Sequence, residues 1–247
     1  MKIAIAVPVY DNVESMFFQS ITSAICYAYE VNLQDENGDK IPLQIEPFVC
    51  SGIIQEARHR LFHECLEWGA DYILWCDSDH VFPVDVIPRL WAHNKDIVGA
   101  NYARRIIPGQ PTAPVSSKLN HTEYGDEPLC YTTQAKAEAG ELERVDHMGM
   151  GLVLMRMSIL EVLIEKAREE GRESFMPLFH WEDKEPGKGT GSIGEDVYFF
   201  RKCRDAGLEV WVDHALSWEV GHITKTILTH AHVERDKPKW FAKLRNE

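Results

Sequence analysis

A chain of 247 residues with 45% hydrophobic residues can bury the core of one large α/β domain or two small ones, and this composition excludes a disordered chain. The formal net charge of -13 makes the average surface repel polyanions, which argues against non-specific binding to nucleic acids or anionic membranes. The six cysteines are scattered and form no Cys-x-x-Cys pair, a pattern typical of reduced thiols in a cytoplasmic protein.

The N-terminus has one basic residue followed by an apolar run, as a secretory signal does. The run is too short before Asp11, and no small-residue cleavage site follows it, so a first β-strand is the better interpretation. No stretch approaches the ~20 apolar residues that span a bilayer. We therefore expect a cytoplasmic protein without a membrane anchor.

Strand and helix signals alternate over the first hundred residues, because short apolar runs are separated by segments with helical spacing of apolar residues. Alternation of this kind predicts parallel strands joined by right-handed crossovers, as in a Rossmann-like half-domain. The predicted strands cover residues 3–9, 43–49, 72–76 and 96–101, and the predicted helices cover residues 13–29, 54–68 and 83–93.

The second half of the chain is less regular. Prolines and glycines interrupt any period over residues 106–143, which favours antiparallel strands with long loops. A glycine-led strand is expected at residues 149–156, followed by helices at 158–170 and 195–206. The charged, glycine-rich stretch 182–192 is typical either of a lid over an active site or of a disordered connector.

The tetrapeptide Asp77-Ser78-Asp79-His80 directly follows the third predicted strand. Two carboxylates at the C-terminal end of a buried strand lie at the rim of a sheet, where α/β proteins bind ligands. A site with few carboxylates suits Mn²⁺ or Mg²⁺, which keeps positions open for substrate phosphates. The alternative is that Asp77 starts a turn and Asp79 caps a helix, and the spacing alone leaves both interpretations open.

Two further segments carry candidate site residues. Glu195 and Asp196 open a predicted helix, where carboxylates either interact with the partial positive charge of the helix N-terminus or act in catalysis. The Gly149-Met150-Gly151 segment either allows the backbone to approach a ligand closely or forms a turn at the start of a strand.

The order of these features along the chain resembles that of a glycosyltransferase of the GT-A fold, close to the family 2 type and its bacterial and phage relatives. The matching motifs are Pro8-Val9-Tyr10-Asp11, Ala57-Arg58, Asp77-Ser78-Asp79, Gly149-Met150-Gly151, Glu195-Asp196 and Gly221-His222. The resemblance implies a single α/β domain with a mixed, mainly parallel sheet flanked by helices and a variable C-terminal half. It divides the chain into a nucleotide-binding half at 1–105, an acceptor and catalytic half at 106–222, and a tail or helix at 223–247.

The resemblance also implies where the nucleotide-sugar donor binds. The Pro8-Val9-Tyr10-Asp11 turn would hold the base and ribose, and Arg58 would contact the nucleotide or pyrophosphate. An acidic residue is commoner at the position of Ser51, which leaves the identity of the base open. The other residues expected to contact the donor are Asp77, Ser78, Gly149, Met150 and Gly151, together with Trp181, whose ring can stack on a sugar or belong to the core.

The metal ligands and the general base follow from the same resemblance. Asp79 is expected to bind Mn²⁺ or Mg²⁺ directly, with Asp77 as a helper and His222 as a distal ligand after the strand-like segment 216–220. The ion would neutralise charge on the leaving pyrophosphate. Asp196, with Glu195 beside it, matches the base that deprotonates the acceptor hydroxyl, which favours an inverting reaction.

The predicted activity is metal-dependent transfer of a sugar from a nucleoside-diphosphate sugar, with UDP favoured, to a hydroxyl acceptor. The acceptor is a saccharide or a modified nucleobase, and a hydroxylated DNA base would need the basic residues Arg104, Arg105, Lys237 and Lys239 near the site. Two alternatives stay open, a nucleotidyltransferase and a non-catalytic nucleotide-sugar-binding module. The first strand is not followed by the glycine-rich basic loop that is usual in nucleotidyltransferases. The sequence makes no prediction of oligomeric state.

Overall fold

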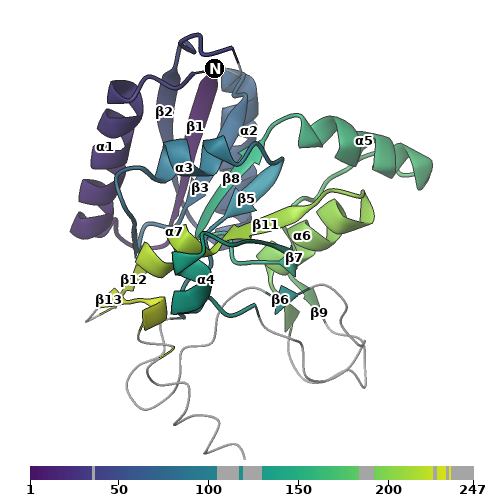
Figure 1. The fold of residues 1–247 in the computed structure, drawn as a ribbon. Coiled ribbons are helices and arrows are strands. Elements are labelled where there is room, and N and C mark those ends of the chain that lie inside the picture. Colours follow the sequence, from purple (N-terminus) through teal and green to yellow (C-terminus); the bar gives the residue numbers. More distant parts are fainter. Residues whose placement is uncertain are drawn as a thin grey trace, which may run out of the picture.

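A central sheet with helices on both faces organises the computed structural model (Figure 1), which describes residues 1–34, 37–104, 117–118, 130–183, 192–224, 227–231 and 234. The eight strands of this sheet lie in the order β2-β1-β3-β8-β5-β11-β7-β6. They are β1 (Lys2–Val9), β2 (Gln44–Ser51), β3 (Tyr72–Cys76), β5 (Ile97–Gly99), β6 (Ser117–Lys118), β7 (Leu142–His147), β8 (Leu152–Arg156) and β11 (Val210–Asp213).

Helices and two small sheets complete the described part of the chain. The helices are α1 (Ser15–Glu30), α2 (Ile54–Trp68), α3 (Val86–Ala92), α4 (Gln134–Glu138), α5 (Ile159–Glu169), α6 (Glu195–Asp205) and α7 (His214–Glu219). One small sheet contains β4 (His80–Val81), β12 (Gly221–Ile223) and β13 (Ile227–Leu228), and the other pairs β9 (Glu182–Asp183) with β10 (Ser192–Ile193). Among the described helices, none is long and apolar enough to cross a membrane.

The direction of the strands confirms the predicted mixed and mainly parallel α/β sheet. Strand β1 pairs in parallel with both β2 and β3, and β5 pairs in parallel with β11. Strand β8 lies between β3 and β5 and runs antiparallel to both, so β5 still points the same way as β3. Strand β7 is antiparallel to β11 and to β6. Only β7 and β8 of the described central strands therefore run against the rest.

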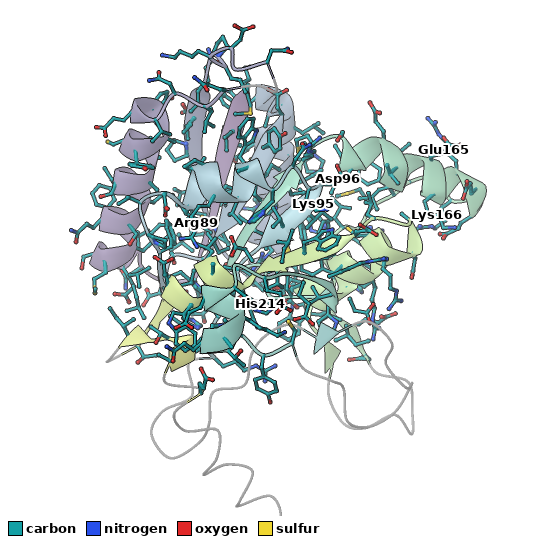
Figure 2. The ribbon with its side chains drawn as sticks, in the orientation of Figure 1. Arg89, Lys95, Asp96, Glu165, Lys166 and His214 are labelled. Atoms are coloured by element: carbon teal, nitrogen blue, oxygen red, sulfur yellow. The ribbon has the colours of Figure 1, made fainter. Side chains whose placement is uncertain are left out.

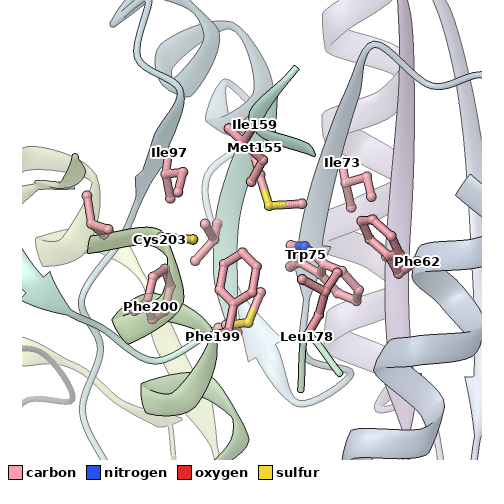
Figure 3. Packing of buried hydrophobic residues seen from close by; sticks show 14 of the residues in the cluster. Phe62, Ile73, Trp75, Ile97, Met155, Ile159, Leu178, Phe199, Phe200 and Cys203 are labelled. Atoms are coloured by element: carbon pink, nitrogen blue, oxygen red, sulfur yellow. The ribbon is translucent and has the colours of Figure 1, made fainter. Parts of the chain in front are cut away.

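Alternating side chains of the strands build an apolar layer on each face of the sheet. In β1, Ala4 and Ala6 pack in one layer, while Ile3 and Ile5 pack in the other. The first layer, shown in Figure 3, includes residues of α2, α5 and α6, and Trp75 packs there against Phe179. The second layer includes residues of α1, α3 and α7. Because both faces of the central strands are buried, their sequences are continuous apolar runs.

The C-terminal ends of the first three strands lie together at one edge of the sheet. Val9 at the end of β1 is paired with Ser51 at the end of β2. The loop after β1 also contacts the loop after β3, because the backbone N–H of Glu14 donates to the carbonyl of Ser78 at 3.2 Å. The motifs after β1, β2 and β3 therefore meet at the edge where parallel sheets bind ligands.

The prediction of a strand-like segment at 216–220 is wrong, because residues 216–219 belong to helix α7 and Val220 is its C-cap. The side chain of Asp213 caps the helix by accepting a hydrogen bond from the N–H of Leu216 at 2.8 Å. Leu216 and Val220 are both buried, and their spacing of four residues is helical rather than strand-like. The strand that carries His222 is the short β12 that follows.

The expectation of antiparallel strands at 106–143 is confirmed only where the chain is described. Strands β6 and β7 pair antiparallel, but the short helix α4 at Gln134–Glu138 was not predicted. Its N-cap is Thr133, whose side chain accepts from the N–H of Lys136. The centre of the possible lid, residues 184–191, lies outside the described residues. Most of the tail at 223–247, which includes Lys237 and Lys239, also lies outside them, and so does Arg105.

Candidate metal and nucleotide-sugar site

Asp79, His80 and His222 form a compact group of metal-ligating side chains. Strands β4 and β12 pair so that His222 lies opposite His80, and the N–H of Ile223 donates to the carbonyl of Asp79 at 2.7 Å. This pairing brings together residues more than 140 positions apart, with His222 Nε2 at 3.3 Å from Asp79 Oδ2 and His80 Nδ1 at 3.1 Å from Asp79 Oδ1. One ligand atom from each of the three lies within 4.8 Å of the other two.

A backbone contact orients His222 for ligation. Its Nδ1 is 2.8 Å from the carbonyl oxygen of Ala103, which can only accept a hydrogen bond, so Nδ1 carries the proton. The lone pair of Nε2 then faces Asp79. Fixing the tautomer of a histidine through its second ring nitrogen is a recurrent feature of metal sites.

The environment of Asp79 keeps its carboxylate ionised. Burial alone raises the pKa of this group, but the close contacts of its two oxygens with the imidazoles of His222 and His80 outweigh burial and leave the pKa well below its usual range. His80 is fully buried, and neither ring nitrogen makes a well-directed hydrogen bond to a described residue. An ionised carboxylate between two imidazoles, one of them with unsatisfied nitrogens, is a donor set that fits a divalent cation.

Gly151 makes room for the rings that support this group. His80 stacks on His222 at a centroid distance of 4.4 Å, and Tyr102 lies edge-on to His80 at 4.3 Å. A Cβ atom on Gly151 would lie 2.7 Å from both His80 Cε1 and Tyr102 Cζ. The rings of His80 and Tyr102 therefore occupy the space beside this glycine. Contact between Gly149-Met150-Gly151 and the nucleotide-sugar donor stays a prediction.

Gly151→Ala is expected to destabilise the protein by about 1–3 kcal/mol, because the added methyl group must displace two packed rings. Thermal or urea unfolding measures the loss. The variant should also weaken metal binding, since His80 and Tyr102 would move. An unchanged free energy of unfolding would contradict this packing.

Arg58 is buried and lies between two acidic residues of the site. Its guanidinium Nη2 is 3.3 Å from Asp77 Oδ1, and its Nε is 3.5 Å from Glu195 Oε1. Asp77 is therefore paired with Arg58 and is not part of the three-residue metal group, so its role as a helper ligand stays a prediction. Removing one partner of a buried ion pair leaves an uncompensated charge, which makes Arg58 a structural as well as a candidate binding residue.

Glu195 and Asp196 lie in the first turn of α6, beside the same arginine. Glu195 Oε2 accepts a hydrogen bond from the indole N–H of Trp181 at 3.0 Å, and Asp196 Oδ1 accepts from the N–H of Val197 at 2.7 Å. Burial raises the pKa of both carboxyl groups, while the nearby charge of Arg58 opposes that rise. The pair therefore combines helix-terminus contacts with the raised pKa of a candidate general base.

His59 holds the segment that leads to Trp181. Its Nε2 accepts hydrogen bonds from the backbone N–H groups of Leu178 and Phe179, at 3.1 and 3.2 Å. A ring nitrogen accepts only when it is unprotonated, and burial lowers the pKa of His59. The neutral ring thus ties α2 to the segment that places Trp181 against Glu195.

His59→Ala is expected to lower the free energy of unfolding by about 2–4 kcal/mol, because two backbone N–H groups lose their acceptor. Urea denaturation measures this loss. The matched control is His63→Ala, one turn further along α2 at an exposed position, which should change stability by less than about 0.5 kcal/mol. Equal losses in the two variants would contradict the anchoring role of His59.

The residues expected to hold the base and ribose lie at the open edge of the sheet. Pro8 and Val9 are buried within β1, whereas Tyr10 is 90% exposed and Asp11 and Ser51 are also exposed. This edge is connected to the metal group, because Ser78 Oγ donates to the carbonyl of Asn12 at 3.3 Å. The structure thus brings the predicted nucleotide turn and the predicted metal ligands to the same end of β1 and β3.

Sequence reasoning missed two residues of the site, His80 and Tyr102. His80 is adjacent to Asp79 in the sequence, so its position was a usable signal. Tyr102 has no such signal, because its place depends on the contact of its hydroxyl with the N–H of Gly151 at 3.1 Å, across 49 residues.

The strand order and the flanking helices define a single α/β domain with a mixed, mainly parallel sheet, as the sequence predicted. Its fold is similar to that of A197 from STIV, whose crystal structure aligns with a TM-score of 0.53 and 15% identity over 94% of this chain and 92% of that chain. No protein-family model matches this chain, and no curated protein matches it. Membership of family 2 therefore stays a prediction.

Two weaker structural similarities are to glycosyltransferases. GalNAc-T7 with UDP, GalNAc and Mn²⁺ aligns with a TM-score of 0.48 and 14% identity, over 90% of this chain and 44% of that chain. A mutant of a Drosophila β1,4-galactosyltransferase 7, in complex with manganese, UDP-Gal and xylobiose, aligns with a TM-score of 0.39 and 15% identity, over 96% and 73%. At these identities the likeness concerns the fold alone.

Proposed function

We propose that this protein is a metal-dependent glycosyltransferase that uses a nucleoside-diphosphate sugar as donor. The observation that carries the proposal is the convergence of Asp79, His80 and His222 next to the acidic pair Glu195-Asp196 at the C-terminal edge of the sheet. Arg58 connects the acidic pair to the turn that carries Asp79, since it contacts both Glu195 and Asp77, two residues before Asp79. A cation site and a candidate base beside one another are the parts that sugar transfer from a diphosphate requires.

The donor would lie along the edge formed by the loops after β1, β2 and β3. Tyr10, Asp11 and Ser51 are exposed there and can contact a base and ribose. A divalent ion at Asp79 and His222, either Mn²⁺ or Mg²⁺, would stabilise negative charge on the diphosphate leaving group. Asp77, held by Arg58, would accept a hydrogen bond from the ribose.

Asp196 is our candidate for the general base. Its carboxylate must be ionised to accept the proton of the acceptor hydroxyl, and a pKa raised by burial makes it a stronger base than an exposed aspartate. Glu195 already binds Trp181 and lies beside Arg58, so we assign it to positioning the Trp181 ring as a platform for a sugar. Attack by the activated hydroxyl would invert the anomeric centre.

The proposal is tested by incubating the full chain with Mn²⁺ and a panel of nucleotide sugars and measuring release of the nucleoside diphosphate. UDP-sugars and Mn²⁺ are the first reagents to use, because UDP and Mn²⁺ are the ligands in the GalNAc-T7 structure. Release or transfer by the wild type supports the proposal. Saturable nucleotide binding without turnover on any acceptor would favour a binding module, and release of pyrophosphate from a nucleoside triphosphate would favour a nucleotidyltransferase.

A further inference from the structure

A second group of metal-ligating side chains lies apart from the site described above. Cys130, Glu143 on β7 and His214 at the start of α7 bring one donor atom each to a common point. Cys130 Sγ is 3.4 Å from Glu143 Oε2 and 3.8 Å from His214 Nε2, and His214 Nε2 is 2.9 Å from Glu143 Oε2. His214 is labelled in Figure 2, where α7 and α4 meet.

The separations of these donor atoms suit a tetrahedral ion. Zinc binds Cys, His and Glu at about 2.0–2.3 Å, which places neighbouring ligand atoms of a tetrahedron about 3.3–3.8 Å apart. Two of the three separations fall in that range. The third, between His214 Nε2 and Glu143 Oε2, is shorter and would have to lengthen slightly when the ion binds. Three protein ligands leave one corner of the tetrahedron for a water molecule.

The imidazole of His214 is oriented for ligation. It is fully buried. Its Nδ1 is 2.9 Å from Thr132 Oγ1, a partner that can hold the proton on Nδ1 and leave the lone pair of Nε2 facing Cys130 and Glu143. This arrangement matches that of His222 in the first site, with a threonine hydroxyl in place of the carbonyl of Ala103.

Lys136 currently supplies the positive charge at this point. Its ammonium group pairs with Glu143 Oε2, and it also lies 3.5 Å from Glu141 Oε1. Lys136 is partly exposed and Glu141 is exposed. The lysine therefore has a second carboxylate partner, to which it can turn when a cation occupies the position beside Glu143.

We propose that Cys130, Glu143 and His214 form a zinc site. Binding converts the thiol of Cys130 to a zinc-bound thiolate and releases its proton to solvent, while Lys136 moves to Glu141. Imidazole and thiolate ligands favour Zn²⁺ over Mg²⁺ and Mn²⁺, so the two sites take different metals.

The site would stabilise the part of the fold that supports the first metal group. It joins the segment before α4 to β7 and to α7, the helix that leads into β12 and His222. The carbonyl of Cys130 also accepts a hydrogen bond from Asn101 Nδ2, two residues before Ala103, whose carbonyl orients His222. A structural zinc here would therefore fix both chain segments that hold His222.

Cobalt substitution tests this proposal directly, because only the second group contains a cysteine. Wild-type protein stripped of metal and loaded with Co²⁺ should show the near-ultraviolet charge-transfer absorption of a cobalt thiolate, and added Zn²⁺ should remove it. Cys130→Ser, a nearly isosteric change, should abolish this band. The control Cys26→Ser, at an exposed position on α1, should retain it.

A second variant keeps the test decisive if Cys130→Ser does not fold. Lys136→Met leaves all three ligands and removes a competing cation, so it should tighten Zn²⁺ binding by about tenfold or more. With Mn²⁺ already present at a saturating concentration to fill the first site, added Zn²⁺ should raise the thermal midpoint of the wild type further. Absence of a thiolate band in the wild type, or weaker Zn²⁺ binding by Lys136→Met, would overturn the proposal.

Discussion

Asp79→Asn is expected to lower metal-dependent sugar transfer by about 10²–10⁴-fold, because it removes a charged ligand of the cation and with it several kcal/mol of leaving-group stabilisation. The amide is similar in size to the carboxylate, so the fold should survive. Initial rates of nucleoside diphosphate release at saturating Mn²⁺ measure the effect.

Asp96→Asn is the matched control for this variant. Asp96, labelled in Figure 2, is exposed and lies 3.8 Å from Arg156, away from the metal group. Its activity should equal that of the wild type. Full activity in Asp79→Asn would show that the cluster of Asp79, His80 and His222 does not hold a catalytic metal.

Asp196→Asn is expected to reduce kcat by about 10²–10⁴-fold and to leave binding of the nucleoside diphosphate unchanged, because the base acts only on the acceptor. Burial raises the pKa of Asp196. The wild-type rate should therefore fall on acidification at a higher pH than the ordinary range of an aspartate would give, since the base works only when ionised. The acid limb of the pH profile of kcat measures this.

The control for this variant lies on the same helix. Asp205, at the other end of α6, is exposed and pairs with Arg204. Asp205→Asn should keep the kcat and pH profile of the wild type. If Asp196→Asn retains kcat, the base must be sought elsewhere, and Glu195 is the nearest alternative.

Regular patterns in the sequence were sufficient for the core of the fold. The apolar runs of β1 and β3 and the helical spacing in α1 and α2 are local signals, and buried parallel strands seldom give any other pattern. The antiparallel insertion of β8 between β3 and β5 has no local signal, because it depends on which strands meet after a long connection. Helix α7 (His214–Glu219) has no clear signal in the sequence, since its six residues are too few for a helical period.

The candidate site was predictable only in part, for a similar reason. Asp79 is a local signal at a strand end, whereas His222 is predicted only through the order of motifs in a family. The zinc-type group of Cys130, Glu143 and His214 has no sequence spacing typical of a metal site, because its ligands come from three distant segments. Only the pairing of β7 with β11, which leads into α7, brings Glu143 and His214 together.

Calorimetric titration of the full chain with UDP, with and without Mn²⁺, tests the central claim most directly. We expect saturable UDP binding by the wild type that requires the metal and is lost in Asp79→Asn, while Asp96→Asn binds as the wild type does. A wild-type protein that binds no nucleoside diphosphate in the presence of Mn²⁺ or Mg²⁺ would contradict a metal-dependent nucleotide-sugar site.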